Sequence, residues 1–234
     1  MNERFAVYFA PASDTPLWAF GTSWLGRDPE RDVDVARLQL DGITAEAIAE
    51  MTVSPRRYGF HGTRKPPFAL VDGQDADTLS AALAAFAASR SPFDIPELKL
   101  SSLNGFLALV PSTQIPALAA LAGSCVAAFD GFRAPPLTGE MDRRRAHGLT
   151  ERQDANLKRW GYPYVMEDFQ FHLTLTARLD PETLEWALPI LTDATAAFTG
   201  TPIWITSLAL YHEPRPGADF RLMARFPFGA NARS

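Results

Sequence analysis

The segment Phe169-Gln170-Phe171-His172-Leu173-Thr174-Leu175-Thr176 alternates apolar and polar residues from one position to the next. Such alternation is typical of a β-strand that buries one face, and we expect a strand over residues 169–179. Successive side chains of a strand point to opposite faces, so the aromatic residues and leucines should enter the core. The other face should then carry a row of polar side chains: Gln170, His172, Thr174, Thr176 and Arg178.

A second segment, Tyr58-Gly59-Phe60-His61-Gly62-Thr63-Arg64-Lys65, repeats the His-x-Thr pattern in the other half of the chain. We expect a strand over residues 57–64, ended by Pro66-Pro67 because proline cannot donate to a sheet ladder. On such a strand His61, Thr63 and Lys65 share one face. If the two strands are neighbours, a polar cleft contains two imidazoles and two hydroxyls.

The rest of the chain predicts strands and helices around these two segments. Apolar runs predict strands at residues 5–10, 98–110, 203–212 and 220–226. The strand over residues 98–110 should be bent or paired with itself around Asn104-Gly105. Apolar residues at helical spacing predict helices at residues 44–50, 77–89, 115–129 and 181–198. Residues 11–35 are rich in turn formers and charges and contain two tryptophans, Trp18 and Trp24, and we assign no element to them.

Each half of the chain thus contains a His-x-Thr strand, followed by a helix and one or two further strands. We expect an α+β fold in one domain over residues 1–234, a bilobal duplicated module with two antiparallel sheets facing a central cleft and helices outside. The approximate halves are residues 1–132 and 162–234. Between them, residues 133–161 predict a polar helical insertion, in which Thr150 and Gln153 fit a capping box.

Composition narrows the class of protein. Hydrophobic residues make up 47% of the 234 residues and charged residues 21%, which is ordinary globular usage. The single cysteine, Cys125, excludes an internal disulfide and a cysteine-cluster metal site. The net charge of −5 disfavours a large nucleic-acid partner. The N-terminal residues do not read as a signal peptide, and polar residues and prolines interrupt the uncharged stretch 100–129, so we expect a cytoplasmic protein without membrane association.

Two imidazoles with adjacent hydroxyls suit the cleavage of a phosphodiester. That reaction needs a base for the nucleophile and an acid for the leaving oxygen, and histidine titrates near neutrality. Hydroxyl groups can hold the non-bridging phosphate oxygens while charge develops. The alternative is structural: His61 and His172 could be core histidines bonded to carbonyls, and threonine favours strands in any case.

At this point the pattern resembles a known family, the two-histidine (2H) phosphoesterase superfamily with its RNA-ligase-like cyclic phosphodiesterases. The longer match Arg57-Tyr58-Gly59-Phe60-His61-Gly62-Thr63, followed by Lys65-Pro66-Pro67-Phe68, is similar to a branch encoded with phosphonate-degradation operons. Trp160-Gly161-Tyr162-Pro163-Tyr164 ahead of the second histidine adds to that resemblance. Arg64 departs from it, since an apolar residue such as leucine is expected there; it should face away from His61.

The resemblance implies a metal-independent hydrolase in which His61 and His172 are the acid–base pair, and Thr63 and Thr174 bind phosphate oxygens. It implies 5-phosphoribosyl 1,2-cyclic phosphate as the substrate. For the second phosphate of this substrate, proximity in sequence offers Lys65, Arg57 and Arg56, while Tyr58 could bond or stack at the cleft edge.

Two other functions stay open: an RNA-end 2′,3′-cyclic phosphodiesterase or ligase, and a non-catalytic module that binds a nucleotide or sugar phosphate. We expect no metal and no cofactor, because neither histidine has a second ligand at metal-binding spacing and no phosphate-cradling glycine loop occurs. Four other groups read as structural or surface residues: Arg143–Arg145, Arg133, His147 and His212.

Overall fold

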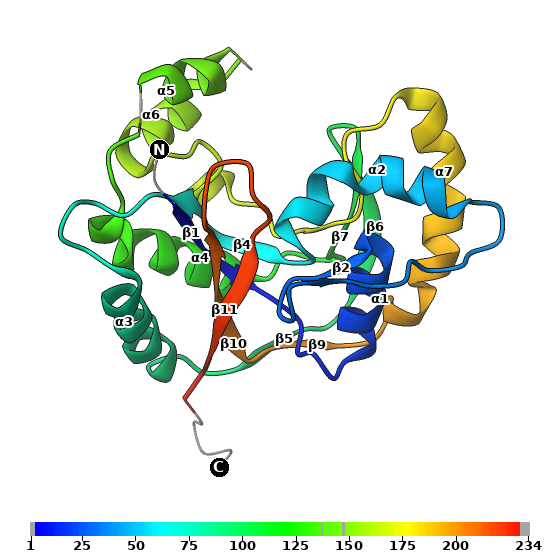
Figure 1. Ribbon diagram of the computed structural model, residues 1–234, viewed down its shortest axis with the longest axis horizontal. Coiled ribbons are helices and arrows are strands. Elements are labelled where there is room, and N and C mark those ends of the chain that lie inside the picture. Colours follow the sequence, from blue (N-terminus) through cyan, green and yellow to red (C-terminus); the bar gives the residue numbers. More distant parts are fainter. Residues whose placement is uncertain (1–2, 137, 147, 230–234) are drawn as a thin grey trace.

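The computed structural model describes residues 3–136, 138–146 and 148–229, which form an α+β fold (Figure 1). Its largest sheet has four antiparallel strands in the order β11-β10-β1-β4. The strands are β1 (Arg4–Phe9), β4 (Gly62–Phe68), β10 (Ser207–Glu213) and β11 (Arg221–Pro227). The first strand, β1, therefore lies between β4, from the first half of the chain, and β10, from the second half.

The two faces of this sheet have different roles. Phe5, Val7 and Phe9 of β1 enter the main core, which α3 (Ala76–Ala88) and α4 (Pro116–Ala128) cover. Burying each such side chain stabilises the fold by about 1.5–3 kcal/mol. Ala6 and Tyr8 point to the opposite face, where Tyr8 packs in a second cluster with Tyr211 and Phe220. Figure 1 shows α3 and α4 on one side of the sheet.

A second sheet consists of the hairpin β6 (Leu98–Leu103) and β7 (Phe106–Pro111) with the short strand β8 (Leu173–Thr174). Asn104 and Gly105 form the hairpin turn with φ angles of 49° and 89°, and the left-handed region at both positions is what a two-residue hairpin loop requires. Helix α7 (Pro181–Thr195) packs against β6 and β7. Both larger sheets combine strands from the two predicted halves, and the bilobal duplicated arrangement stays a prediction.

Two short antiparallel pairs complete the strands of the described residues. They are β2 (Arg27–Asp28) with β3 (Val33–Asp34), and β5 (Phe93–Ile95) with β9 (Ile203–Ile205). The predicted hairpin over residues 98–110 is confirmed, and the helices predicted at 77–89, 115–129 and 181–198 appear as α3, α4 and α7. No helix in the described part of the chain has the length and apolarity of a membrane span.

Two helices differ from the sequence predictions, one because it was not predicted and one because it is longer than predicted. Residues 16–25 form helix α1 (Pro16–Leu25), which the Thr15 side chain caps by accepting from the Trp18 N–H. Helix α2 (Ala45–Tyr58) continues well past residue 50 until Gly59, whose φ of 74° ends it. Arg57 and Tyr58 therefore lie in the last helical turn and not on a strand.

Both His-x-Thr strands also differ from their predicted extents. Strand β4 runs through Pro66-Pro67 to Phe68, which is possible because β4 is an edge strand and needs no donor on its free side. Strand β8 is only two residues long, because the N–H groups of Leu175 and Thr176 both bond to the Leu107 carbonyl. This irregularity breaks the alternation, and Thr176 is buried with its hydroxyl accepting from the Leu107 N–H.

The predicted polar insertion is helical. It contains α5 (Thr138–Arg145) and α6 (Glu151–Trp160), and the Thr150–Gln153 capping box is confirmed. Short 3-10 turns lie at Asp130–Phe132, Met166–Asp168 and Ala196–Phe198. His147 lies outside the described residues.

Gly21 of α1 packs directly on the Phe60 ring, next to His61. A β-carbon at Gly21 would lie 2.1 Å from the nearest ring atom, whereas one at Gly123 of α4 would meet only the Met166 sulfur at 3.5 Å. We expect Gly21→Ala to lower the free energy of unfolding by about 1–3 kcal/mol through overpacking. Gly123→Ala should be neutral or slightly stabilising, because alanine is the better helix former.

Urea unfolding of the two variants beside the wild-type protein measures this difference. Equal stability of Gly21→Ala and wild type would contradict the close contact between α1 and Phe60.

Candidate active site

His61 lies in the short connection between α2 and β4, and its ring is held on two sides. Its Nδ1 is 2.8 Å from the Gly59 carbonyl. A carbonyl only accepts, so Nδ1 carries the proton and the neutral ring presents the lone pair of Nε2. The Tyr8 ring stacks on the imidazole with centroids 3.8 Å apart. The Thr63 hydroxyl lies 3.4 Å from Nε2.

His172 lies just before β8 and repeats this arrangement. Its Nδ1 is 2.9 Å from the carbonyl of Gln170, again two residues earlier in the chain. The Phe106 ring of β7 packs beside it, with centroids 5.7 Å apart. In both segments a local backbone carbonyl therefore fixes the ring and leaves Nε2 available for chemistry.

Burial disfavours the protonated form of both histidine rings in the empty protein. Desolvation lowers the pKa of His61 to about 4, with the nearby His172 lowering it further and the Gly59 bond opposing the change. Burial also lowers the pKa of His172, while the bond to Gln170 opposes it. His61 is therefore neutral at pH 7 and can accept a proton.

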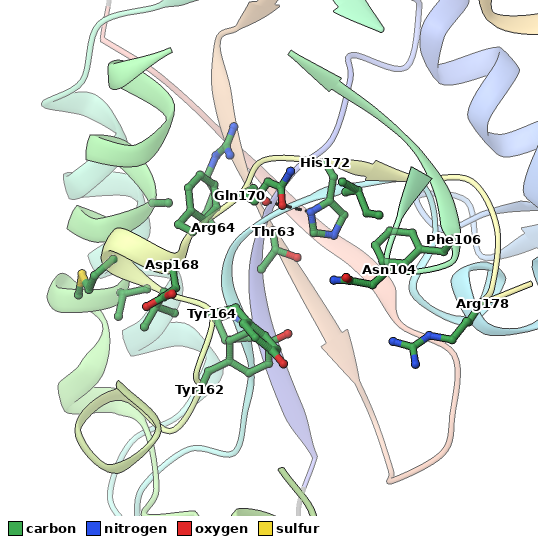
Figure 2. Close-up of a pocket in the computed structure, with 17 residues that line it drawn as sticks. Thr63, Arg64, Asn104, Phe106, Tyr162, Tyr164, Asp168, Gln170, His172 and Arg178 are labelled. Carbon is green, nitrogen blue, oxygen red and sulfur yellow. Dashed lines mark hydrogen bonds between the residues drawn. The ribbon is translucent and has the colours of Figure 1, made fainter. Parts of the chain in front are cut away.

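Two adjoining cavities connect the histidines. The first, of about 320 Å³, contains His172, and the second, of about 270 Å³, contains His61. Thr63, Pro66 and Tyr162 line both cavities, so Thr63 is placed between the two imidazoles. Figure 2 shows Thr63 and His172 in the first cavity, with Tyr162 and Tyr164 on one wall and Asn104, Phe106 and Arg178 on the other.

The predicted polar residues are only partly brought together. Thr63 and Tyr58 line the cavities, but half-buried Thr174 lines neither of the two. Arg57 is bound by the Glu213 carboxylate and the Ala218 carbonyl. Arg56 is bound by two carboxylates on the outer surface, Asp34 and Asp219.

Lys65 does not share a face with Thr63. Tyr8 of β1 pairs with Thr63 while Val7 pairs with Lys65, so β4 has one extra residue between them. Such a bulge turns Lys65 to the core side, where its Nζ donates to the Val126 carbonyl at 3.1 Å and lies 3.5 Å from the Asp130 carboxylate. Burial lowers its pKa to about 8.

Arg64 is the extra residue of this bulge, and its guanidinium is buried. It lies 4.7 Å from the centroid of the Phe171 ring, and its nitrogens have no hydrogen-bond partner within the described structure. Figure 2 shows the guanidinium directed away from Thr63 and His172, as the sequence predicted. Burial lowers its pKa to about 10.

Several cavity residues were not predicted. Arg4 and Tyr8 of β1 line the second cavity, although the run around them reads only as an apolar strand. Arg144 also lines it: it lies 4.7 Å above the Tyr162 ring and pairs with Glu140, whereas the sequence indicated a solvated helix face. The apolar wall of the first cavity contains Phe106, which no sequence signal marked.

The remaining candidates stand apart from the cavities. His212 contacts Glu3 and stacks on Phe5, and Arg133 pairs with Asp130. Cys125 is buried, which raises the pKa of its thiol to about 12. Among the described residues no group of three or more histidine, cysteine, aspartate or glutamate side chains is arranged to hold a metal ion.

Comparison with known proteins gives two kinds of match. A relative from Janthinobacterium sp. (strain Marseille), named ribose 1,5-bisphosphate phosphokinase PhnN, is 38% identical over 229 residues, which is 96% of this chain and 51% of the relative. A protein of the same name from Laribacter hongkongensis (strain HLHK9) is 37% identical over 222 residues, 94% of this chain and 50% of that one. The chain thus spans about half the length of these curated relatives.

Solved structures similar to the chain share little sequence with it. E. coli LigT complexed with 3′-AMP has a TM-score of 0.49 and 11% identity, covering 98% of this chain and 100% of that one. A structure described as a phosphoesterase has a TM-score of 0.42 and 13% identity, covering 97% and 99%.

The phosphonate-operon name PhnN agrees with the phosphonate-associated resemblance seen in the sequence. The family model matches residues 63–221, which include Thr63, the polar insertion and His172. The chain therefore belongs to the family described as "Protein of unknown function (DUF1045)".

Proposed function

We propose that this chain is a metal-independent phosphodiesterase that opens 5-phosphoribosyl 1,2-cyclic phosphate to ribose 1,5-bisphosphate. The observation that carries the proposal is the matched pair of histidines, each fixed through Nδ1 by a carbonyl and each bordering a cavity that Thr63 also lines. Such a pair supplies one base and one acid on either side of a bound phosphate.

His61 suits the role of base. Its pKa of about 4 leaves Nε2 unprotonated at neutral pH, ready to take a proton from the attacking water. The water oxygen bonds to phosphorus, and the bond from phosphorus to ribose O2 breaks. His172, protonated when the phosphate anion binds beside it, donates its proton to O2. The Thr63 hydroxyl binds a non-bridging oxygen, and solvent then restores both protonation states.

The name of the relatives supports the direction of ring opening. Breaking the bond to O2 leaves the phosphate on O1 and gives ribose 1,5-bisphosphate, the compound in the name of the curated kinases. This chain covers about half of those proteins and contains no Gly-x-x-x-x-Gly-Lys-Ser/Thr phosphate loop. The proposed phosphodiesterase would therefore supply ribose 1,5-bisphosphate to a kinase that lies outside this chain.

A nucleoside 2′,3′-cyclic phosphate is the second candidate substrate. Phe106, Tyr162 and Tyr164 line the first cavity and offer aromatic faces on which a base could stack. The net charge of −5 favours a mononucleotide over a long RNA, because binding of RNA depends on neutralising many phosphates.

Substitution of either histidine tests the mechanism. We expect His61→Ala and His172→Ala to lower kcat by about 100-fold to 10,000-fold, the usual contribution of a general acid or base. His212→Ala is the matched control, since His212 contacts Glu3 outside both cavities, and it should keep wild-type activity. Phosphorus NMR of chelator-treated protein follows the conversion of cyclic diester to monoester.

Activity that needs an added metal, or that survives both substitutions, would contradict the paired-histidine mechanism. Tight ligand binding without turnover in the wild-type protein would show a binding module, and turnover of 2′,3′-cyclic nucleotides alone would select the second candidate.

The lowered pKa of His61 can be measured by NMR titration of its ring. We expect a midpoint near pH 4, and a higher midpoint in Tyr8→Leu, because the stacked ring of Tyr8 helps to exclude water. The folded pKa lies below the value of about 6.5 in an unfolded chain. Protonation therefore favours unfolding, and the contribution of His61 to stability falls as the pH drops from 6.5 to 4. A wild-type midpoint near 6.5 would remove the basis for assigning His61 as the base.

A further inference from the structure

The proposed substrate carries two phosphates, and the cations that the sequence offered to the second one are engaged elsewhere. Lys65 faces Asp130 in the core, Arg57 is held by Glu213, and Arg56 is held by surface carboxylates. A binding site for a phosphomonoester needs a cation or several donors that can reach the ligand. The question, which rests on the proposed function, is which residues of the cleft provide them.

The arginines of the second cavity are already paired. Arg4 bonds to Glu213, a carboxylate it shares with Arg57, and Arg144 lies 2.8 Å from Glu140. Binding a phosphate there would require these pairs to loosen or to share their charge. This cavity is therefore the less favourable place for an additional dianion.

Arg178 differs from these arginines. It lines the first cavity together with His172, its side chain is exposed, and among the described residues it has neither a carboxylate partner nor a hydrogen bond. Figure 2 shows the guanidinium directed toward the cavity, on the wall opposite Tyr162 and Tyr164. An unpaired guanidinium offers five donors in a fork that matches phosphate oxygens.

The fold holds the stem of Arg178 in place. The Leu179 N–H donates to the Gly105 carbonyl at 2.7 Å and ties this segment to the β6–β7 turn. A β-carbon at Gly105 would lie 3.1 Å from the Arg178 Cγ, so the stem passes closely over this glycine. The neighbouring turn residue, Asn104, presents its amide to the same cavity (Figure 2).

The carboxylate among the described lining residues does not compete for Arg178. Asp168 is held by Arg152 at 2.8 Å and by Gln153 and Asn156, and its side chain is only 9% exposed. Figure 2 shows it on the far side of the cavity. The wall formed by Asn104, Phe106 and Arg178 thus presents an uncompensated positive charge and an amide to the cavity.

We propose that Arg178, with Asn104 beside it, binds the second phosphate of the substrate, a phosphomonoester on the sugar whose cyclic diester lies at His172 and Thr63. Arg178 is then the residue that selects a phosphorylated sugar over an unphosphorylated one. Arg178 was expected from the sequence on the polar face of the His172 segment, but no ligand was assigned to it.

A binding cycle tests this assignment without any turnover. Affinities of ribose 1,5-bisphosphate and ribose 1-phosphate are measured by calorimetry for wild type and for Arg178→Met, which keeps the stem over Gly105 and removes the charge. We expect wild type to bind the bisphosphate about 10- to 100-fold more tightly, since a charge-assisted hydrogen bond contributes on that scale. Arg178→Met should lose this preference and keep its affinity for ribose 1-phosphate.

Two further variants complete the test. Arg178→Lys should restore part of the preference, and Arg215→Ala, an exposed arginine in the β10–β11 turn outside both cavities, should keep all of it. Equal preference in wild type and Arg178→Met, or no preference in wild type, would overturn the assignment. Parallel assays with 5-phosphoribosyl 1,2-cyclic phosphate separate the two hypotheses, because an Arg178-dependent preference without hydrolysis would refute only the proposed function.

Discussion

The central position of β1 is the constraint on which the candidate site depends. Hydrogen bonds to β4 on one side and β10 on the other fix this strand, and its alternate residues fill the main core. The residue of β1 that faces the other way, Tyr8, stacks on His61 and helps to bury it. A single strand thus joins the packing of the core to the electrostatics of a histidine more than 50 residues away.

Local backbone geometry then sets the chemistry of both imidazoles. Each Nδ1 donates to the carbonyl of the residue two positions earlier, and this bond needs no distant partner. In both rings Nε2 is therefore the nitrogen without the proton. Burial lowers the pKa of both rings, so neither carries a stable charge in the empty cleft. The cleft keeps positive charge on arginines instead, although the whole chain has a net charge of −5. The net charge of the whole chain therefore does not predict the sign of the charge inside this cleft.

Irregularities of the two His-x-Thr segments decide which predicted residues belong to the site. The bulge at Arg64 keeps Thr63 in the cleft and turns Lys65 to the core, against the regular alternation assumed from the sequence. In the second segment, the N–H groups of Leu175 and Thr176 share the Leu107 carbonyl, and this irregularity leaves the Thr176 side chain buried. Helix α2 continues past Pro55 and ends only at Gly59, so Arg57 approaches Glu213 from a helix and not from a strand. Bulges depend on pairing with a neighbouring strand, and a single segment contains no record of that neighbour.

The sequence by itself determined the α+β class, most helices, the β6–β7 hairpin and the capping box, because these follow from local periodicity, turn chemistry and residue type. From residue type it also predicted the two histidines as the chemical centre. Only the tertiary structure decided that Thr63 lies in both cavities and Thr174 in neither, and that Arg178 has no partner among the described residues while Arg57 is paired with Glu213. The reason is physical: the availability of a charge depends on which carboxylates the fold brings within reach, and those carboxylates come from distant parts of the chain.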